Sequence, residues 1–289
     1  GENGKRYDLF KKRLMFPIID RLDRVIGFGG RLIMGEGPKY INSWENDFFK
    51  KREVLYNVNG LKNLTERSKN IFLVEGYTDV IALSKIGKLA VAPLGTSISL
   101  EQISILWRYI DEPTVFLDGD KAGQAATKRL LNMVISEIDV EKSLNFILLA
   151  DKEDPEDILN KENGIEKFSY LLENKKSLLE ALMIFEKKID LSSPERLLGY
   201  KKRLFNKLNI IKNEEIRDLY KVFLQKKLSI VFSKSMNRTQ ENFSEVNDSY
   251  FLKLSRNKPD NRFVLRRERS IVVAMINNFK LLQDYDEQL

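Results

Sequence analysis

Residues 71–80 read Ile-Phe-Leu-Val-Glu-Gly-Tyr-Thr-Asp-Val, an apolar run that ends in an acid and a glycine. A continuous apolar run of this length is typical of a strand buried on both faces of a parallel sheet. Similar runs of apolar residues lie at residues 89–92, 114–117 and 144–149. Segments with helical character separate these runs, at residues 78–86, at 99–107 and from 122 onward. This alternation predicts an α/β fold with a mostly parallel sheet over residues 69–160.

The segment before this unit has a different character. Residues 14–19 and 25–28 predict two short antiparallel strands, and residues 20–24 predict the turn between them. Lys and Arg are frequent in the same segment. We therefore expect a basic α+β subdomain over residues 1–68.

The segment after the α/β unit is predicted to be helical. Apolar residues recur at helical spacing, so residues 158–232 are interpreted as helix throughout and residues 161–232 as a helical subdomain. Residues 233–262 are polar and predict a linker with at most a short helix. Residues 263–289 predict a further helical segment.

The composition excludes several kinds of chemistry. The chain has 289 residues and contains neither cysteine nor histidine, which excludes disulfides, zinc sites built on those residues, and Ser-His-Asp catalysis. A metal ion would need oxygen ligands, which favours Mg²⁺, Mn²⁺ or Ca²⁺. The net charge of +7 suits a polyanionic partner such as nucleic acid.

The sequence also indicates where the protein works. No stretch approaches the roughly 20 apolar residues that span a bilayer, and the first residues contain no secretory signal. We expect no membrane partner. Because the chain begins with Gly1 and not with Met, we expect an excised fragment or a processed chain.

Acidic residues follow three of the predicted strands. Glu75 comes directly after the first, Asp118 and Asp120 follow the third, and Asp154 comes shortly after the fourth. Ligands of open parallel sheets bind at the carboxyl ends of the strands, so these acids are expected to converge. Carboxylates held together repel one another unless a cation neutralises them. Two divalent ions at such a site can serve phosphoryl displacement, whereas the alternative is that the acids cap helices.

The acidic motifs resemble the TOPRIM domain, which occurs in DnaG-type primases, topoisomerases and some nucleases. The resemblance rests on residues 74–80, 94–97, 118–123 and 153–157. It implies that Glu75, Asp118 and Asp120 are catalytic and that Asp79 supports them. It also implies a metal site formed by Glu75, Asp118, Asp120, Asp154 and Glu156. The family usually has Asp where this chain has Glu156, so Asp157 is the alternative ligand.

The flanking segments are similar to the catalytic core of DnaG-type primases, also called the RNA polymerase domain. The similar stretches are residues 10–18, 25–31 and 38–43. The resemblance implies that six residues bind nucleotide or template, namely Lys11, Arg13, Arg31, Lys39, Tyr40 and Lys51. Leu9 stands where the family is expected to carry a basic residue.

The resemblance implies a nucleotidyltransferase that makes short RNA primers from ribonucleoside triphosphates on single-stranded DNA. Its cofactors would be Mg²⁺ or Mn²⁺, in two or more ions, without zinc in this fragment. An RNA–DNA hybrid would be its product complex. A replicative helicase and a single-strand-binding protein would be partners through regions largely outside this chain, and residues 263–289 would begin a helicase-interaction domain. The expected location is the cytoplasm, at the nucleoid and replication fork.

Two other functions remain open from the sequence. A TOPRIM nuclease or topoisomerase would share the acids, although no tyrosine stands in a recognisable DNA-cleavage context. A scaffold that binds nucleic acid without turnover would share the basic residues. The glycines at 27, 29 and 30 do not form a phosphate-binding loop, because the strand-loop-helix context and the Lys-Ser/Thr ending are missing.

Overall fold

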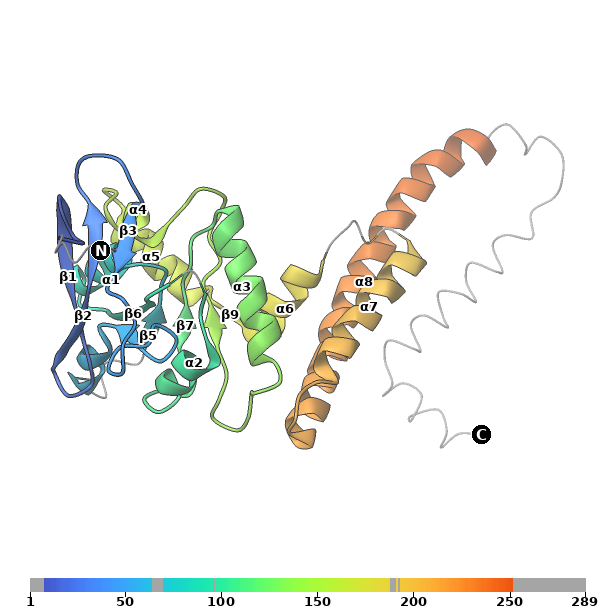
Figure 1. The fold of residues 1–289 in the computed structure, drawn as a ribbon. Helices are drawn as coiled ribbons and strands as arrows, with labels where there is room; N and C mark the ends of the chain where they lie inside the picture. The colour runs from blue at the N-terminus through green and yellow to red at the C-terminus, as the bar shows by residue number, and fades with distance from the viewer. Residues whose placement is uncertain (1–7, 64–69, 96, 188–190, 192, 252–289) are drawn as a thin grey trace, which may run out of the picture. The chain divides into compact units, whose positions relative to one another are not determined.

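The computed structural model describes residues 8–63, 70–95, 97–187, 191 and 193–251 (Figure 1). The chain divides into a unit over residues 1–232 and a second unit over residues 233–289. The fold and the site described below belong to the first unit. None of the described helices has the length and the apolar character needed to cross a membrane.

A six-stranded mixed sheet forms the centre of the first unit, in the order β4-β6-β5-β7-β8-β9. The inner neighbours β6, β5, β7 and β8 run parallel, whereas the edge strands β4 and β9 are antiparallel to theirs. The predicted mostly parallel α/β sheet is therefore confirmed. The bounds are β4 Leu55–Tyr56, β5 Ile71–Leu73, β6 Leu89–Pro93, β7 Thr114–Val115, β8 Asn145–Phe146 and β9 Lys176–Ser177.

Helices cover both faces of this sheet because its strands are apolar on both faces. Helix α1 (Tyr77–Lys85) buries Val80 and Leu83 against one face, around Phe72 and Phe116. Helices α2 (Leu100–Leu106) and α3 (Lys121–Val134) contribute to the larger core on the other face. The predicted cap of α2 is confirmed, since the Ser99 hydroxyl accepts a hydrogen bond from the Gln102 amide at 3.1 Å.

A separate three-stranded antiparallel sheet precedes the central sheet, in the order β1-β2-β3. The predicted hairpin is confirmed as β1 (Arg13–Ile19) and β2 (Val25–Leu32), whereas β3 (Tyr40–Asn42) was not predicted. A small hydrophobic cluster of Phe16, Ile18, Phe49, Tyr77 and Leu94 joins the two sheets. The rings of Phe16 and Tyr77 are stacked with their centroids 4.8 Å apart. This three-stranded sheet, which lies in the segment rich in Lys and Arg and is called the basic sheet below, is thus fixed against the end of the central sheet.

The prediction of uninterrupted helix over residues 158–232 is wrong in detail. Edge strand β9 interrupts it, and Ser177 then begins α6 by accepting a hydrogen bond from Glu180. Ser193 caps α7 in the same way, with proline at the first turn. Short polar breaks of this kind carry no apolar periodicity, so they were not detected. The helices are α4 Pro155–Leu159, α5 Gly164–Glu173, α6 Leu178–Glu186, α7 Pro194–Leu208 and α8 Glu214–Phe251, and a 3₁₀ helix spans Val58–Asn63.

Helix α8 is longer than the sequence predicts. Residues 233–251 are helical, although a linker was expected to begin at residue 233. Adding residues to an existing helix costs little compared with nucleating one, so a polar segment can continue a helix that packing has started. The rest of the predicted linker and the helical segment predicted at 263–289 lie outside the described residues.

Candidate active site

Acidic residues from several elements line one cavity at the carboxyl end of the parallel strands. The cavity has a volume of about 400 Å³. Its acids are Glu75, Asp79, Asp118, Asp154 and Glu156. The basic sheet contributes to the same cavity through Lys39, Tyr40 and Asn42. The convergence predicted for Glu75, Asp118 and Asp154 therefore occurs around a space that also faces cationic and aromatic side chains.

The turn at Gly119 brings the acids of two segments together. The Gly119 amide donates a hydrogen bond to the Glu153 carbonyl oxygen at 2.8 Å. A Cβ atom at residue 119 would lie 1.8 Å from the Ala150 carbonyl oxygen, so only glycine fits this close backbone approach. Asp118 directly precedes Gly119, and Asp154 directly follows Glu153. The contact between Gly119 and Glu153 therefore places both acids at one cavity.

Glu75 and Asp118 are in direct contact. The Asp118 amide donates a hydrogen bond to Oε1 of Glu75 at 3.2 Å. The Oδ1 atom of Asp118 is buried and has no hydrogen-bond partner among the described residues. A buried acceptor without a partner is costly, and it indicates a ligand site or a functional group.

The pKa values of these carboxyl groups show how poorly the negative charge is compensated. Burial raises the pKa of Asp118 to about 7, and the charges of Glu75, Asp79, Asp154 and Asp120 add to the effect. Burial also raises the pKa of Glu75, with a further contribution from Asp120, while the Asp118 amide and Arg129 oppose the increase. The raised pKa values mean that the ionised forms of these carboxyl groups are destabilised, so the cavity is suited to bind positive charge.

Asp120 and Asp154 also cap helices. Oδ1 of Asp120 accepts a hydrogen bond from Gly123 at the start of α3, at 2.8 Å. Oδ1 of Asp154 accepts one from Asp157 at the start of α4, at 2.6 Å. Each cap uses one carboxylate oxygen, so capping accounts for only part of these two side chains. Asp120 is not among the residues that line the cavity, although its charge raises the pKa of Asp118.

Asp79 lines the cavity and connects the first turns of α1 and α4. Its carboxylate accepts hydrogen bonds from the amides of Gly76, at 3.0 Å, and Glu156. Burial raises the pKa of Asp79 to about 6, and the charges of Asp154 and Glu156 add to this. The contacts fit the predicted supporting role. Glu156 lines the cavity while the Asp157 side chain is exposed, which favours Glu156 as the additional acid.

The donor set at this edge fits a hard divalent cation by its chemistry, because every donor is oxygen. The buried Oδ1 of Asp118 and the crowded negative charge support the same fit. Among the described residues, however, no three acids are grouped closely enough to form a ready-made cage. The fit therefore rests on the chemistry of the donors and not on a preformed cage.

The six predicted nucleotide- and template-binding residues are placed differently. Lys39 and Tyr40 line the cavity, and the Lys39 ammonium lies 5.8 Å from the centre of the Tyr40 ring. The Arg31 guanidinium lies 5.9 Å from the same ring. The Arg13 guanidinium donates hydrogen bonds to the carbonyl oxygens of Gly30 and Pro38, so it holds the loop before β3. Neither Lys11 nor Lys51 lines the cavity.

Comparison with known proteins adds two domain matches. Residues 1–62 match the family described as the DNA primase catalytic core, N-terminal domain, and residues 69–142 match the Toprim domain. The DNA primase of Rickettsia felis is 42% identical over 187 residues, which are 64% of this chain and 31% of that protein. The solved structure of the Escherichia coli primase catalytic core aligns with a TM-score of 0.70 and 35% identity, and the alignment covers 79% of this chain and 73% of that one.

The chain belongs to the DnaG-type DNA primase family. A structure of a DnaG primase catalytic domain bound to single-stranded DNA aligns with a TM-score of 0.69 and 34% identity, over 77% of this chain and 71% of that one. The chain spans only 31% of the length of the Rickettsia felis primase.

Two residues of this DnaG-type core matter to the site and were missed by the sequence analysis. The Tyr77 hydroxyl donates a hydrogen bond to Oδ1 of Asn42 at 2.6 Å, and Nδ2 of Asn42 donates to the Leu94 carbonyl oxygen. Burial raises the pKa of Tyr77, so its hydroxyl remains a donor at neutral pH. Both lie inside the motifs that indicate the family, but no local pattern predicts a contact between residues so far apart in sequence.

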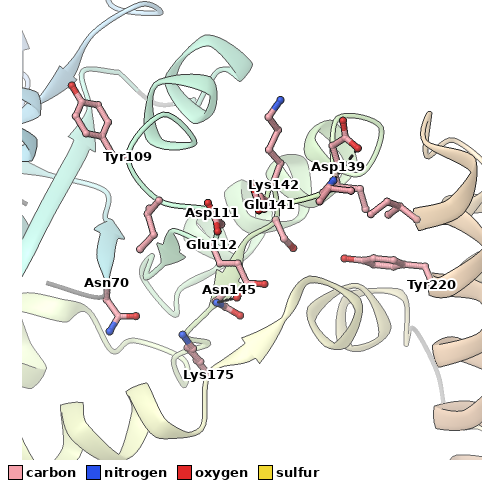
Figure 2. Close-up of a pocket in the computed structure, with 15 residues that line it drawn as sticks. Asn70, Tyr109, Asp111, Glu112, Asp139, Glu141, Lys142, Asn145, Lys175 and Tyr220 are labelled. Atoms are coloured by element: carbon pink, nitrogen blue, oxygen red, sulfur yellow. Dashed lines mark hydrogen bonds between the residues drawn. The ribbon is translucent and has the colours of Figure 1, made fainter. Parts of the chain in front are cut away.

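A larger cavity of about 700 Å³ lies at the opposite edge of the sheet, where the parallel strands begin (Figure 2). Asp111 and Glu112 precede β7 there, and Tyr220 of α8 points toward the cavity in Figure 2. Nδ2 of Asn145 donates a hydrogen bond to Glu112 at 3.0 Å. None of the predicted site residues lines this cavity. Although this cavity is larger, it contains none of the acids or basic residues on which the candidate active site is based.

Proposed function

We propose that this chain is the RNA-synthesising core of a primase, which joins ribonucleotides into short primers on a single-stranded DNA template. The observation that carries the proposal is the single cavity shared by the strand-end acids and by Lys39 and Tyr40 of the basic sheet. A polymerase needs both kinds of group, because acids hold the cations that stabilise phosphoryl transfer while basic residues hold the polyanionic substrates.

We propose Mg²⁺ or Mn²⁺ as the cofactor, held by Glu75, Asp118, Asp154 and Glu156, with Asp120 beside them. When bound, such ions lower the pKa of an attacking hydroxyl and neutralise the charge of a triphosphate. The orphaned Oδ1 of Asp118 supports this assignment. The Asp118 amide keeps Oε1 of Glu75 in place, and Asp79 holds the start of α4 near the cavity.

The side chains of the basic sheet would bind and orient the nucleic acid and the incoming nucleotide. Lys39 and Arg31 both lie within 6 Å of the Tyr40 ring centre, so they surround an aromatic surface with positive charge. Phosphates would bind these cations, and a base or ribose would contact the ring. Lys11 and Lys51 would extend this basic surface outside the cavity, while Arg13 supports the loop that carries Lys39.

The wider partners follow from the family. We propose that an RNA–DNA hybrid leaves the cavity and that the protein acts at the replication fork in the cytoplasm. A replicative helicase and a single-strand-binding protein would bind mainly through parts of the protein other than this chain.

Replacing Asp118 by Asn tests the proposal. The substitution removes negative charge while keeping the shape of the side chain, so primer synthesis should fall by about 100-fold or more. The assay supplies labelled ribonucleoside triphosphates, single-stranded DNA and Mg²⁺, and it measures short RNA products. Asp157→Asn is the matched control, because that exposed side chain does not line the cavity.

The same assay separates the competing functions. A TOPRIM nuclease would degrade the DNA and make no RNA. A scaffold would bind DNA with unchanged affinity in the presence or absence of the acids and would never incorporate label. Normal primer synthesis by the Asp118→Asn protein would contradict the site assignment.

A further inference from the structure

The loop after β3 presents two large aromatic side chains to solvent. Trp44 is 73% exposed and Phe48 is 77% exposed. Single exposed apolar residues are common on protein surfaces, but two large aromatic rings four residues apart on one short loop are not explained by packing. Their exposure therefore suggests a binding role.

Hydrogen bonds hold this loop in one conformation. Oδ1 of Asn46 accepts hydrogen bonds from the amides of Phe48 and Phe49, at 2.9 and 3.1 Å. The Phe49 side chain is fully buried between the sheets. The Glu45 carboxylate accepts a hydrogen bond from the Lys51 amide at 2.7 Å. Because the loop is anchored at these points, the exposed rings are presented by a supported backbone.

Cationic residues lie close to the two rings in sequence. Lys50, Lys51 and Arg52 directly follow the loop in sequence. Two of the nearby acids are already engaged, since Glu45 binds a backbone amide and Glu53 lies 3.6 Å from the Lys50 ammonium. Residues 8–62 contain eleven Lys and Arg against seven Asp and Glu. This composition favours a polyanionic partner over a basic or neutral one.

Phe48 also lines a small cavity with cations at its edge. The cavity has a volume of about 210 Å³, and Leu22 and Ile26 provide apolar surface within it. Arg21 and Arg24 lie along the same cavity, together with Asp20 and Glu53, and Arg24 is paired with Asp20 at 2.7 Å. Apolar surface beside the guanidinium group of Arg21 suits a planar base attached to a phosphate.

The loop begins close to the candidate active site. Asn42 lines the catalytic cavity, and Trp44 follows it by two residues. Two residues of extended chain span at most about 7 Å. A DNA strand that leaves the cavity of the candidate active site along the basic sheet would therefore reach Trp44 within a short distance.

We infer that Trp44 and Phe48 form a stacking surface for unpaired bases of the single-stranded template that leads to the catalytic cavity. The inference rests on the proposed primase function and assigns two contacts beyond it. Every base can stack on an aromatic ring, so this surface would hold the template without selecting its sequence.

Tryptophan fluorescence gives a direct test, because the chain contains only two tryptophans. The other one, Trp107, is partly buried and donates a hydrogen bond from its indole nitrogen to the Ser143 carbonyl oxygen. In a Trp107→Phe protein, Trp44 is the single reporter. Titration with a short oligothymidylate should quench Trp44 emission along the same curve as the anisotropy of an end-labelled oligothymidylate.

Substitutions separate stacking from charge. Trp44→Ala and Phe48→Ala should each weaken oligothymidylate binding by about tenfold without changing the dependence of affinity on salt. Lys50→Gln should instead lower the slope of log affinity against log salt by about one. Trp44→Phe should restore most of the binding. Tyr170→Ala is the matched control, because Tyr170 is a 65% exposed aromatic residue on α5 outside the basic sheet.

The two measurements distinguish the possible failures. Normal anisotropy binding with unchanged Trp44 emission and unaffected Ala variants would overturn the stacking surface and leave the primase proposal standing. That result would point to a protein partner for the two rings. No anisotropy change at all, even at low salt, would overturn both proposals.

Discussion

Tyr77 is the residue at which the two sheets meet. Its ring stacks on Phe16 and lies edge-on to Tyr56, and its hydroxyl donates to Asn42. Gly29 must be glycine for this arrangement, because a Cβ atom there would lie 2.4 Å from the Tyr77 hydroxyl oxygen. The Tyr77 side chain thus connects β3, the strand that carries Tyr40, to the end of the central sheet that carries the acids.

Replacing Tyr77 by Phe removes only the hydroxyl. We expect the free energy of unfolding to fall by about 1 kcal/mol, because Oδ1 of Asn42 loses a partly buried donor while the ring packing is kept. Urea unfolding of Tyr77→Phe, Asn42→Ala and the double variant gives the coupling energy of the pair. Additive effects of the two substitutions would contradict the contact.

Replacing Gly119 by Ala should damage the active site more severely. The new methyl group would meet the Ala150 carbonyl oxygen, so the backbone must shift at a cost of about 3 kcal/mol. Primer synthesis should be lost with it, since Asp118 and Asp154 would separate. Gly199→Ala in α7 is the control, because its nearest contact is a flexible arginine at 3.5 Å and helix propensity should raise stability by about 0.5–1 kcal/mol. Equal thermal stability of the two variants would count against the tight turn.

The convergence of the acids could be predicted from their positions in the sequence. Glu75 and Asp118 come at strand ends, and parallel strands bring such ends together. The hydrogen bond between Tyr77 and Asn42 could not be predicted, because it joins two elements whose relative placement depends on the packing of Phe16, Phe49 and Leu94. The metal-site assignment of all five acids stays a prediction, and two of them, Asp120 and Asp154, also cap helices.

At the scale of the elements, an ion pair connects α6 to α8. The Lys227 ammonium lies 2.9 Å from Oε1 of Glu180, and the Ser177 amide donates to Oε2 of the same carboxylate. The Lys227 hydrogen bond is the largest of the causes that lower the pKa of Glu180 to about 2. The pair therefore holds the first turn of α6 to the long helix.

This pair should contribute to stability in a defined range of pH. Because the folded pKa of Glu180 lies below its ordinary value of 4.5, its contribution is present above that value and is lost as the pH falls toward about 2. The Glu180 side chain is 36% exposed, so solvent screening limits the effect to about 1 kcal/mol. Glu180→Gln should flatten the unfolding free energy against pH in this range. Glu162→Gln, at an exposed turn, is the control and should show the same dependence of unfolding free energy on pH as the parent protein. Identical pH dependence in the two variants would contradict the linkage.

Elements with strong patterns were predictable and short polar ones were not. The four inner strands of the central sheet were found from their apolar runs, and α2 was found from its cap. Strands β3 and β9 have three and two residues and no apolar alternation, so they exist through pairing with neighbours. The continuation of α8 beyond residue 232 was missed because apolar spacing, on which the prediction relied, ends there.

Every residue that lines the candidate active site lies within residues 1–232. Among the side chains that the structure describes, Leu228, Val231 and Phe232 are the last along the chain to pack in or against the main hydrophobic core. We expect a protein shortened to residues 1–232 to melt within a few degrees of the 289-residue chain and to bind oligothymidylate equally well. Calorimetry and anisotropy measure both properties. Loss of the cooperative transition would show that residues 233–289 are needed for folding.

The α/β class and the family could be inferred at this scale because the motifs are dense between residues 10 and 160. The boundaries between subdomains are harder to infer. Residues 55–56 precede the predicted boundary at 68/69, yet they form β4 of the central sheet. Strand partnership depends on the three-dimensional arrangement, so the order of segments along the chain does not reveal it.

Strand β4 has a consequence for how such enzymes can be recombined. It forms the edge of the central sheet next to β6, and its own Leu55 and the following Val58 and Leu61 are buried in the main core. A TOPRIM module grafted from this chain into another protein without these residues would carry an open sheet margin and an unfilled core, and it would be prone to self-association. Exchange of such modules during evolution would therefore require the recipient to supply its own border strand.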